Sequence, residues 1–446
     1  MSWLGVLRLA LVQMALGAIV VLTTSTLNRV MAVELLLPAL VPGLLVGLHH
    51  AVQLTRPRMG FGSDLGGRRT PWIAGGMVVL ALGGFLAAVA TAWMGSDRTA
   101  GLALAVVGYA CVGAGVSAAG TSLLVLLAKQ VAPDRRAAAA AVVWVMMIVG
   151  FAVTAGTAGR YLDPYSPERL VLVSGTVSAV ALTLALLALW GVERDGTPAA
   201  PPGAPTHFLT ALAQAWGDAD ARRFTVFVFV SMVAYSTQDL ILEPFAGVRF
   251  GLTPGETTSL SGIQHGGTLA GLLLGALAGR RLGGIAFGSL RAWIVGGCLA
   301  SGLALLGLVV GDRFGGPDWP LRANVFLMGV ANGAFSIAAI GSMMALASAG
   351  GPGREGVRMG LWGASQAIGF ALGGVLGTAA ADLARWLLGS QVEAYVTVFA
   401  VEALAFVAAA LLAARIAIPA LLPAHKASDT QGAPARAPAT PLGGSP

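Results

Sequence analysis

The chain has 446 residues, of which 56% are hydrophobic and only 11% are charged, and its formal net charge is +7. A soluble domain usually carries about 25% charged residues, so the composition excludes an ordinary soluble protein. The basic residues are scattered in short loops, which is typical of a membrane topology signal and argues against nucleic-acid binding. We therefore expect a polytopic, all-α membrane protein surrounded by lipid.

Apolar runs recur along nearly the whole length, each long enough to cross a hydrocarbon core of about 30 Å. The first run continues past Val21 without a convincing cleavage site, which predicts an uncleaved helix and not a signal peptide. The sequence predicts twelve transmembrane helices, at residues 8–33, 36–59, 72–94, 100–129, 137–159, 170–192, 224–248, 256–279, 286–311, 321–348, 356–384 and 393–414.

The predicted helices form two sets of six, residues 1–192 and 223–414. Between them, residues 193–222 form a Pro-rich linker, and residues 415–446 form a Pro/Ala/Gly-rich tail that is expected to be disordered. Most of the 27 Lys and Arg residues lie at the termini and in the loops of one side. The positive-inside rule then places the linker and both termini in the cytoplasm.

The two sets of helices share short sequence pairs in the same order. These pairs are Pro42-Gly43 with Pro254-Gly255, Gly67-Arg68-Arg69 with Gly279-Arg280-Arg281, and Gly150-Phe151 with Gly369-Phe370. The offset is 212 residues for the first two pairs and 219 for the third. Two six-helix repeats related by an axis along the membrane normal are the architecture of the major facilitator superfamily.

The loop after the second predicted helix, GFGSDLGGRR at residues 60–69, resembles the signature motif of that superfamily. In the superfamily this motif acts as a conformational latch, and the residues that match it here are Gly60, Asp64, Gly67, Arg68 and Arg69. The second repeat has Ala276 at the position of Asp64, so a latch would be asymmetric. The alternative is a solvated basic loop that only sets topology.

Three further blocks resemble one family within the superfamily. They are LNRVMAVE at 27–34, RFTVFVF at 223–229 with YSTQDLILEPFAG at 235–247, and FGLTPGE at 250–256 with LSGIQHGG at 260–267. Together they resemble the PucC/LhaA family, also called the bacteriochlorophyll delivery family. The resemblance implies a non-enzymatic factor in the inner or intracytoplasmic photosynthetic membrane of a bacterium. It would assist light-harvesting antenna assembly, with bacteriochlorophyll as cargo and no intrinsic cofactor, and with antenna polypeptides and pigment-synthesis enzymes as partners.

Acidic side chains near one end of the seventh predicted helix are costly in a membrane. At 1.5 Å per residue, Asp239 and Glu243 lie about 22 and 28 Å beyond Phe224, nearer an interface than the midplane. Gln238 is beside them, and Asn28, Arg29 and Glu34 occupy the matching end of the first helix. An ion pair between Arg29 and either acid is one expectation. The group then forms either a polar cap or gate, or a direct contact with a ligand.

His265 lies about 14 Å into the eighth predicted helix, close to the midplane. A neutral imidazole can ligate the magnesium of a chlorin, carry a proton or bond a neighbouring helix, and all three roles stay open. Gln264 is a weaker candidate ligand. His49 and His50 are adjacent on the second helix, so they point to different faces and at most one is expected to enter a central cavity.

Trp144, Trp362, Phe151 and Phe370 either line such a cavity or simply pack between helices. The sequence contains no metal-binding spacing of Cys and His, no Walker loop and no nucleophile elbow. We therefore predict no catalytic or metal-binding residues. A proton-coupled secondary transporter that uses Asp239, Glu243 and His265 is the alternative function, and an enzyme of pigment synthesis is a third.

Overall fold

The structure is a computed structural model that describes residues 1–56, 68–132, 135–193, 216–276, 281–282, 285–286, 288–315, 319–349 and 355–416. Three of the predicted latch residues, Gly60, Asp64 and Gly67, therefore lie outside the described residues. So do most of the predicted linker and almost all of the predicted tail.

The first six predicted helices are present, and the first is irregular. It runs from Trp3 to Glu34 as α1 (Trp3–Val21), a π-helical segment (Leu22–Thr26), α2 (Leu27–Arg29) and a second π-helical segment (Val30–Glu34). The next five are α3 (Leu40–Val52), which ends in a 3-10 turn (Gln53–Thr55), α5 (Thr70–Trp93), α6 (Arg98–Gln130), α7 (Arg136–Leu162) and α8 (Pro167–Leu189).

The last six predicted helices are also present. They are α10 (Ala219–Phe250), α11 (Pro254–Gly275), α12 (Leu290–Val310), α13 (Leu321–Ala349), α14 (Glu355–Leu388) and α15 (Gln391–Ala414). The prediction that the ninth helix begins at residue 286 is wrong, because Ile285–Ala286 form strand β2, which pairs antiparallel with β1 (Arg281–Leu282). The helix begins at Leu290, where the side chain of Ser289 accepts a hydrogen bond from the amide of Ala292.

Within the described residues, ten helices are long and apolar enough to cross a membrane, with Trp3–Glu34 counted as one. The two that are not are α3, which is short, and α11, which is rich in Gly, Ser and Thr and carries Gln264 and His265. They are the second helix of each set of six. The chain is a multi-pass membrane protein, and the two helices that fall short of the span criterion, one by length and one by composition, occupy equivalent positions.

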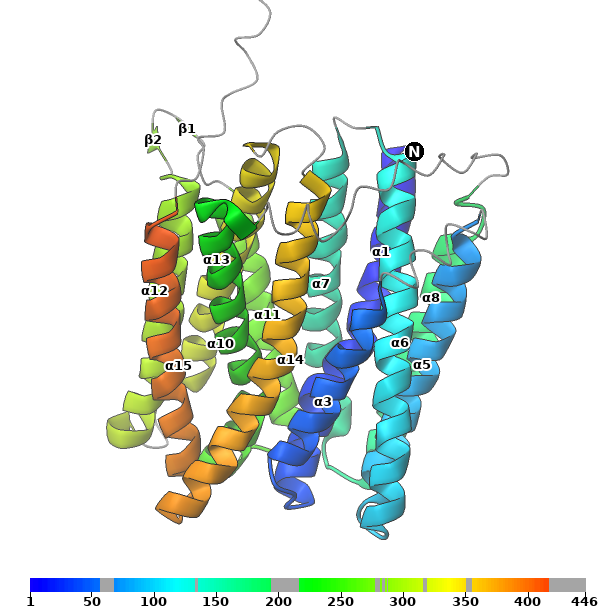
Figure 1. The fold of residues 1–446 in the computed structure, drawn as a ribbon. Helices are drawn as coiled ribbons and strands as arrows, with labels where there is room; N and C mark the ends of the chain where they lie inside the picture. Colours follow the sequence, from blue (N-terminus) through cyan, green and yellow to red (C-terminus); the bar gives the residue numbers. More distant parts are fainter. Residues whose placement is uncertain are drawn as a thin grey trace, which may run out of the picture.

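The two sets of helices pack in the same way. Helix α1 contacts α7 and α8 as α10 contacts α14 and α15, and α5 contacts α8 as α12 contacts α15. The sets meet where α3 lies beside α14 and α7 beside α11, at the centre of Figure 1. We call them the first half and the second half. The N-terminus and the end of α15 lie at one end of the bundle, the termini end, and the opposite end is the distal end.

Glycine permits close helix packing at several of these contacts. A Cβ on Gly267 would lie against the backbone oxygen of Phe326, and one on Gly271 against that of Val330, both on α13. A Cβ on Gly266, one position earlier, would meet nothing within 4 Å. The abundant glycines therefore hold specific helices together, as expected in a membrane bundle.

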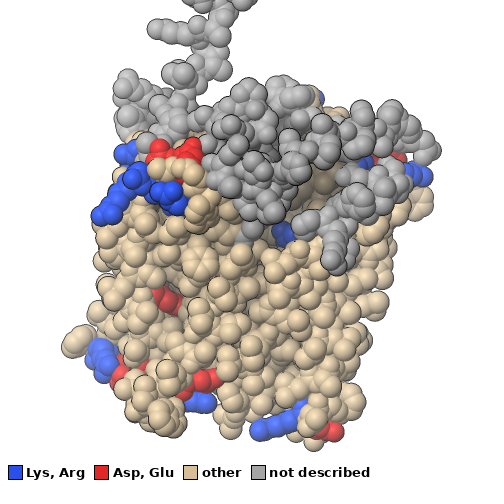
Figure 2. Space-filling view, viewed as in Figure 1, with Lys and Arg blue, Asp and Glu red and all other residues tan. Residues whose placement is uncertain are grey.

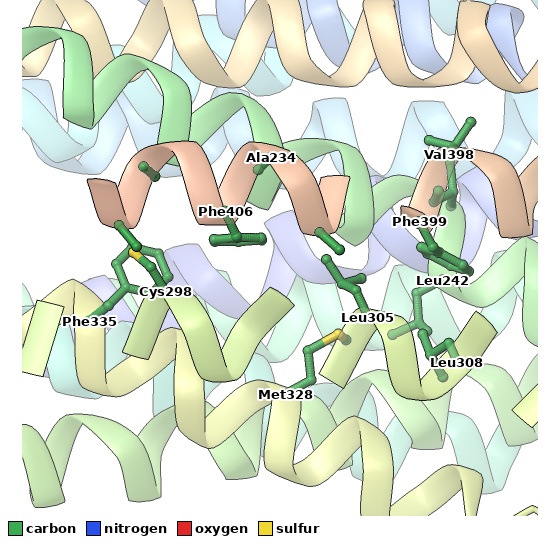
Figure 3. Packing of buried hydrophobic residues seen from close by; sticks show 14 of the residues in the cluster. Ala234, Leu242, Cys298, Leu305, Leu308, Met328, Phe335, Val398, Phe399 and Phe406 are labelled. Atoms are coloured by element: carbon green, nitrogen blue, oxygen red, sulfur yellow. The ribbon is translucent and has the colours of Figure 1, made fainter. Parts of the chain in front are cut away.

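The second half has a continuous aromatic and aliphatic core (Figure 3). Phe399 and Phe406 of α15 contact Phe245 of α10 and Phe335 of α13, with ring centroids 5.1 and 5.8 Å apart. Trp362 is fully buried against Phe224, so its role is packing. On the face shown in Figure 2, most charged side chains lie at the two ends of the bundle and the middle is largely uncharged. This distribution fits a molecule that spans a membrane.

Candidate functional site

A polar seam joins the first helix to α10 and α11 in the distal part of the bundle. The hydroxyl groups of Thr26 and Thr258 are 3.0 Å apart, and Asn28 donates a hydrogen bond to the backbone oxygen of Leu240. Thr26 ends one π-helical segment and Asn28 follows it. Such segments are frequent at functional sites because they widen the helix and redirect its side chains.

Arg29 is buried in this seam and is held from two sides. It forms an ion pair with Glu34 and donates a hydrogen bond of 2.8 Å to the backbone oxygen of Leu252. Its guanidinium lies against Gly247, where a Cβ would lie only 2.8 Å from it. The predicted ion pair with Asp239 or Glu243 is therefore wrong, because the two π-helical segments place Glu34 within reach of Arg29 along the same helix.

Gln238 and Glu243 of α10 are buried and Asp239 is half-buried, and α10 contacts the segment of the first helix that carries Arg29. Glu243 is 2% exposed and lies near Arg29 and near the hydroxyl groups of Thr257 and Ser261 on α11. Those hydroxyls donate to the Pro254 oxygen and to Ser25, so neither carboxylate oxygen of Glu243 has a well-formed hydrogen bond from a described residue. Neither polar atom of the Gln238 side chain has such a bond, nor has Oδ1 of Asp239. The polar side chains of these three residues are thus not fully satisfied by the described part of the protein.

His265 lies at the contact between the halves. Its ring is 5.0 Å from that of Phe151 on α7, and Nδ1 has no hydrogen-bond partner among the residues that the structure describes. Gln264 is also buried, and its Nε2 is likewise without a described partner. The two predicted residues Gln264 and His265 are thus adjacent on α11, and each has a buried nitrogen that could bind a ligand.

His50 lies on α3, the helix of the first half that is equivalent to α11, and it too packs against a helix of the opposite half. Its ring stacks on Phe370 of α14 at 5.4 Å, just as His265 meets Phe151, and these two phenylalanines belong to the repeated Gly-Phe pair. Both histidines approach Nε2 of Gln53, His49 through Nε2 at 2.9 Å and His50 through Nδ1 at 3.3 Å, but only the His50 ring packs on a helix of the other half. Of the two adjacent histidines, His50 is therefore the one at the contact between the halves.

The buried atoms without partners distinguish this region from ordinary packing. An unsatisfied buried polar group costs about 1–3 kcal/mol, and native proteins contain few of them. Seven of the sixteen such atoms in the described part of the chain lie on five residues of α10 and α11, the two helices of the second half that contact the first helix: Gln238, Asp239, Glu243, Gln264 and His265; the others, on residues such as Gln13, His49 and Glu402, are scattered over other helices. This concentration favours contact with a bound molecule over a purely structural cap.

Tyr165, in the loop that joins α7 to α8, lies outside the membrane-spanning segments. Burial, followed by the nearby Glu34 carboxylate, raises the pKa of Tyr165 to about 12. The Glu34 carboxylate therefore interacts electrostatically with Tyr165 in this distal loop as well as with Arg29.

Several buried polar residues were missing from the sequence prediction. Glu402 of α15 is 4% exposed, and both of its carboxylate oxygens are without a described partner. An acid in the middle of a predicted span was the available signal. Glu193 accepts hydrogen bonds from the amides of Arg69 and Thr70, 2.7 and 2.8 Å away, and so anchors the start of α5. Arg69, a predicted latch residue, is thereby held at the termini end.

Two recesses lie away from the polar seam. One, of about 660 Å³, runs between α12 and α13 and is lined mainly by Gly, Ala and Leu. The other, of about 580 Å³, lies near Arg249, Trp319 and Arg322 at the distal end. Neither is lined by any of the predicted site residues.

Residues 26–421 match the family described as PUCC protein. The chain belongs to the PucC family. It is 51% identical over 413 residues to the "Bacteriochlorophyll synthase 44.5 kDa chain" of Rhodobacter capsulatus, covering 93% of this chain and 95% of that relative. It is 30% identical to "Protein PucC" of Rhodobacter capsulatus, covering 90% of each chain. It is also 30% identical to "Protein PucC" of Cereibacter sphaeroides, covering 89% and 88%.

Solved transporter structures share the fold. The D-xylose-proton symporter superposes with a TM-score of 0.67 at 15% identity, covering 94% of this chain and 98% of that one. A bacterial homolog of the human lysosomal transporter Spinster gives 0.64 at 16% identity, covering 92% and 95%. These values confirm the predicted major facilitator superfamily fold, and at this identity they carry no information on substrate. The family and the fold together indicate a non-enzyme, although one relative is named as a synthase chain.

Proposed function

We propose that this protein is a non-enzymatic membrane factor that holds or delivers bacteriochlorophyll during light-harvesting antenna assembly. Its relatives carry the names PucC and bacteriochlorophyll synthase chain, and the observation that carries the proposal is the group of unpartnered polar atoms on α10 and α11. A pigment with a polar macrocycle edge and a metal centre satisfies such atoms, whereas lipid does not.

His265 is the residue assigned to the magnesium of the pigment. A neutral imidazole nitrogen is a common metal ligand, and this ring is buried beside Phe151 with an Nδ1 that no described residue hydrogen-bonds. Gln238, Gln264 and Glu243 are assigned to carbonyl and ester groups at the macrocycle edge, with the Glu243 carboxyl group donating when it carries a proton. Antenna polypeptides and pigment-synthesis enzymes are the proposed partners, and the photosynthetic inner membrane is the proposed location.

Deletion of the gene in a phototrophic bacterium tests this function. Antenna absorbance should fall, while uptake of unrelated solutes stays unchanged. A gene copy that encodes His265→Ala should fail to restore the absorbance, whereas a copy that encodes His49→Ala should restore it, because His49 bonds Gln53 and not the seam. Normal antenna absorbance in the deletion strain would contradict the proposal.

A proton-coupled secondary transporter is the second candidate, and it is favoured by Oδ1 of Asp239 and both carboxylate oxygens of Glu243, which are buried without a hydrogen-bond partner among the described residues. Buried acids of this kind bind and release protons in transporters. Purified protein in liposomes under a pH gradient should then take up a solute, and Glu243→Gln should abolish the proton dependence. Absence of proton movement with every candidate solute would count against this function.

A further inference from the structure

Two carboxylates join the halves at the distal end, and each lies at the start of a helix of the opposite half. Asp163 follows α7 of the first half; it accepts a hydrogen bond of 2.7 Å from the Thr253 hydroxyl and one of 3.3 Å from the Gly255 amide. Both donors belong to the start of α11. A carboxylate at a helix N-terminus is favourable because the helix dipole and the free amides attract it.

The second carboxylate repeats this arrangement from the other side. Asp382 of α14 accepts hydrogen bonds of 3.0 and 2.7 Å from the amides of Ala39 and Leu40, at the start of α3. Ala39 is the N-cap residue of α3, and its methyl side chain cannot accept a hydrogen bond from these amides. The first half therefore depends on the second half to cap this helix.

The two aspartates occupy equivalent positions in the repeats. They are 219 residues apart, the same offset that relates Gly150-Phe151 to Gly369-Phe370 in the same two helices. The helices that they cap, α3 and α11, are also equivalent. Two independent contacts of the same chemistry at symmetric positions are a feature of the repeat and not a local accident.

The other hydrogen bonds between described residues of the two halves lie in the same part of the bundle. They join Thr26 to Thr258, Ser25 to Ser261, Asn28 to the Leu240 oxygen and Arg29 to the Leu252 oxygen. Asp163 and Asp382 lie on the distal side of these contacts, one at each junction between halves, α7 with α11 and α14 with α3.

We propose that Asp163 and Asp382 form a paired clamp that holds the distal ends of the two halves together, so that cargo reaches the polar seam from the termini end. Opening at the distal end requires both carboxylates to leave the helix N-termini. The clamp adds to the proposed function the end of the bundle from which cargo enters. Only the identity of the cargo rests on that function.

Spin-label distances between the halves test the clamp in the full chain. Labels are placed at two exposed distal positions, Ser96→Cys and Phe314→Cys, with Cys111 and Cys298 replaced by Ala. The parent should give one short-distance population. The double variant Asp163→Ala, Asp382→Ala should add a longer one, with the ratio of open to closed molecules rising tenfold or more, since a hydrogen bond to a charged acceptor is worth roughly tenfold or more in an equilibrium constant.

Asp97→Ala is the matched control. Asp97 caps α6 at the same end through two hydrogen bonds of 3.0 Å, to the amides of Thr99 and Ala100, but both lie in the first half. This variant should keep the parent distances. A double variant with the parent distances, or an equal change in the Asp97→Ala protein, would overturn the clamp.

Gly255→Ala provides a second route to the same result if the double variant does not fold. It keeps both carboxylates but places a methyl group 2.3 Å from the backbone oxygen of Gly159 and 2.5 Å from Oδ2 of Asp163, so the end of α7 and its carboxylate must move away from the start of α11. The longer population should appear here also, and parent distances in this variant would refute the clamp. These measurements need no pigment, so their failure is distinguishable from failure of the proposed function.

Discussion

Replacement of Arg29 by Met should destabilise the protein much more than loss of an ordinary ion pair. The Arg29 side chain is 3% exposed, and it serves both Glu34 and the Leu252 oxygen. Met fills much of the same volume but leaves the Glu34 carboxylate and this oxygen without their donor. It also removes the positive charge that offsets Glu243.

The size of the effect follows from this burial. Removal of one partner of a fully buried ion pair costs about 3–5 kcal/mol, and this is an upper bound here because the Glu34 side chain is 33% exposed. With an unfolding entropy of about 2.1 cal/mol/K per residue, a chain of 446 residues should lose up to about 3–5 °C in its unfolding midpoint. The matched control is Arg313→Met, whose pair with Glu393 at 2.6 Å lies at the same end but is half exposed. An exposed pair contributes at most about 1 kcal/mol, so this midpoint should fall by about 1 °C or less.

The assay is thermal unfolding of both variants in the same mild detergent, followed by intrinsic fluorescence and gel filtration. Equal shifts in the two variants would refute the reasoning, because they would show that the Arg29 pair is no more buried in solution than the Arg313 pair. A rise in the midpoint of Arg29→Met would refute it more strongly.

Three further outcomes are expected. Gly267→Val should lower the unfolding midpoint by several degrees and Gly266→Val should leave it unchanged, because only a Cβ at Gly267 meets α13; equal effects would contradict the packing. Glu402→Leu should raise the midpoint, since it removes a buried carboxylate without a described partner; a lower midpoint would show that the carboxylate is satisfied. Stability should fall from pH 10 to about 12 as Tyr165 ionises more readily in the unfolded chain; Tyr165→Phe should remove part of this fall, and an unchanged profile would contradict the raised pKa.

Hydropathy predicts the twelve helices well, because the length and apolar character of a span are set locally. The irregularity of the first helix was not predictable in this way. A π-helical segment adds a single residue to one turn, and neither the LTTST of Leu22–Thr26 nor the VMAVE of Val30–Glu34 marks that extra residue in the sequence. As a result, nothing in the sequence pattern indicates that Glu34 lies within reach of Arg29, and the ion pair was assigned to the wrong acid.

The residues of the polar seam were predictable because polar groups in apolar helices are conspicuous, as at Glu243 and His265. Their partners depend on how the halves meet. Only the structure shows that His50 and not His49 lies at the contact with α14. The equivalence of Asp163 and Asp382 could have been predicted from their offset of 219 residues, which matches that of the repeated Gly-Phe pair. Each nevertheless looked like an ordinary interfacial carboxylate until its distant helix N-terminus was placed beside it.

The most direct test of the central claim is the absorbance spectrum of the protein purified in mild detergent from a pigmented host. Bound bacteriochlorophyll should co-purify with the parent protein and with His49→Ala. The ratio of pigment to protein should fall strongly in His265→Ala, whose loss removes the assigned magnesium ligand. An unchanged ratio in His265→Ala would remove that ligand, and a parent protein that carries no pigment at all would contradict the claim that it holds bacteriochlorophyll.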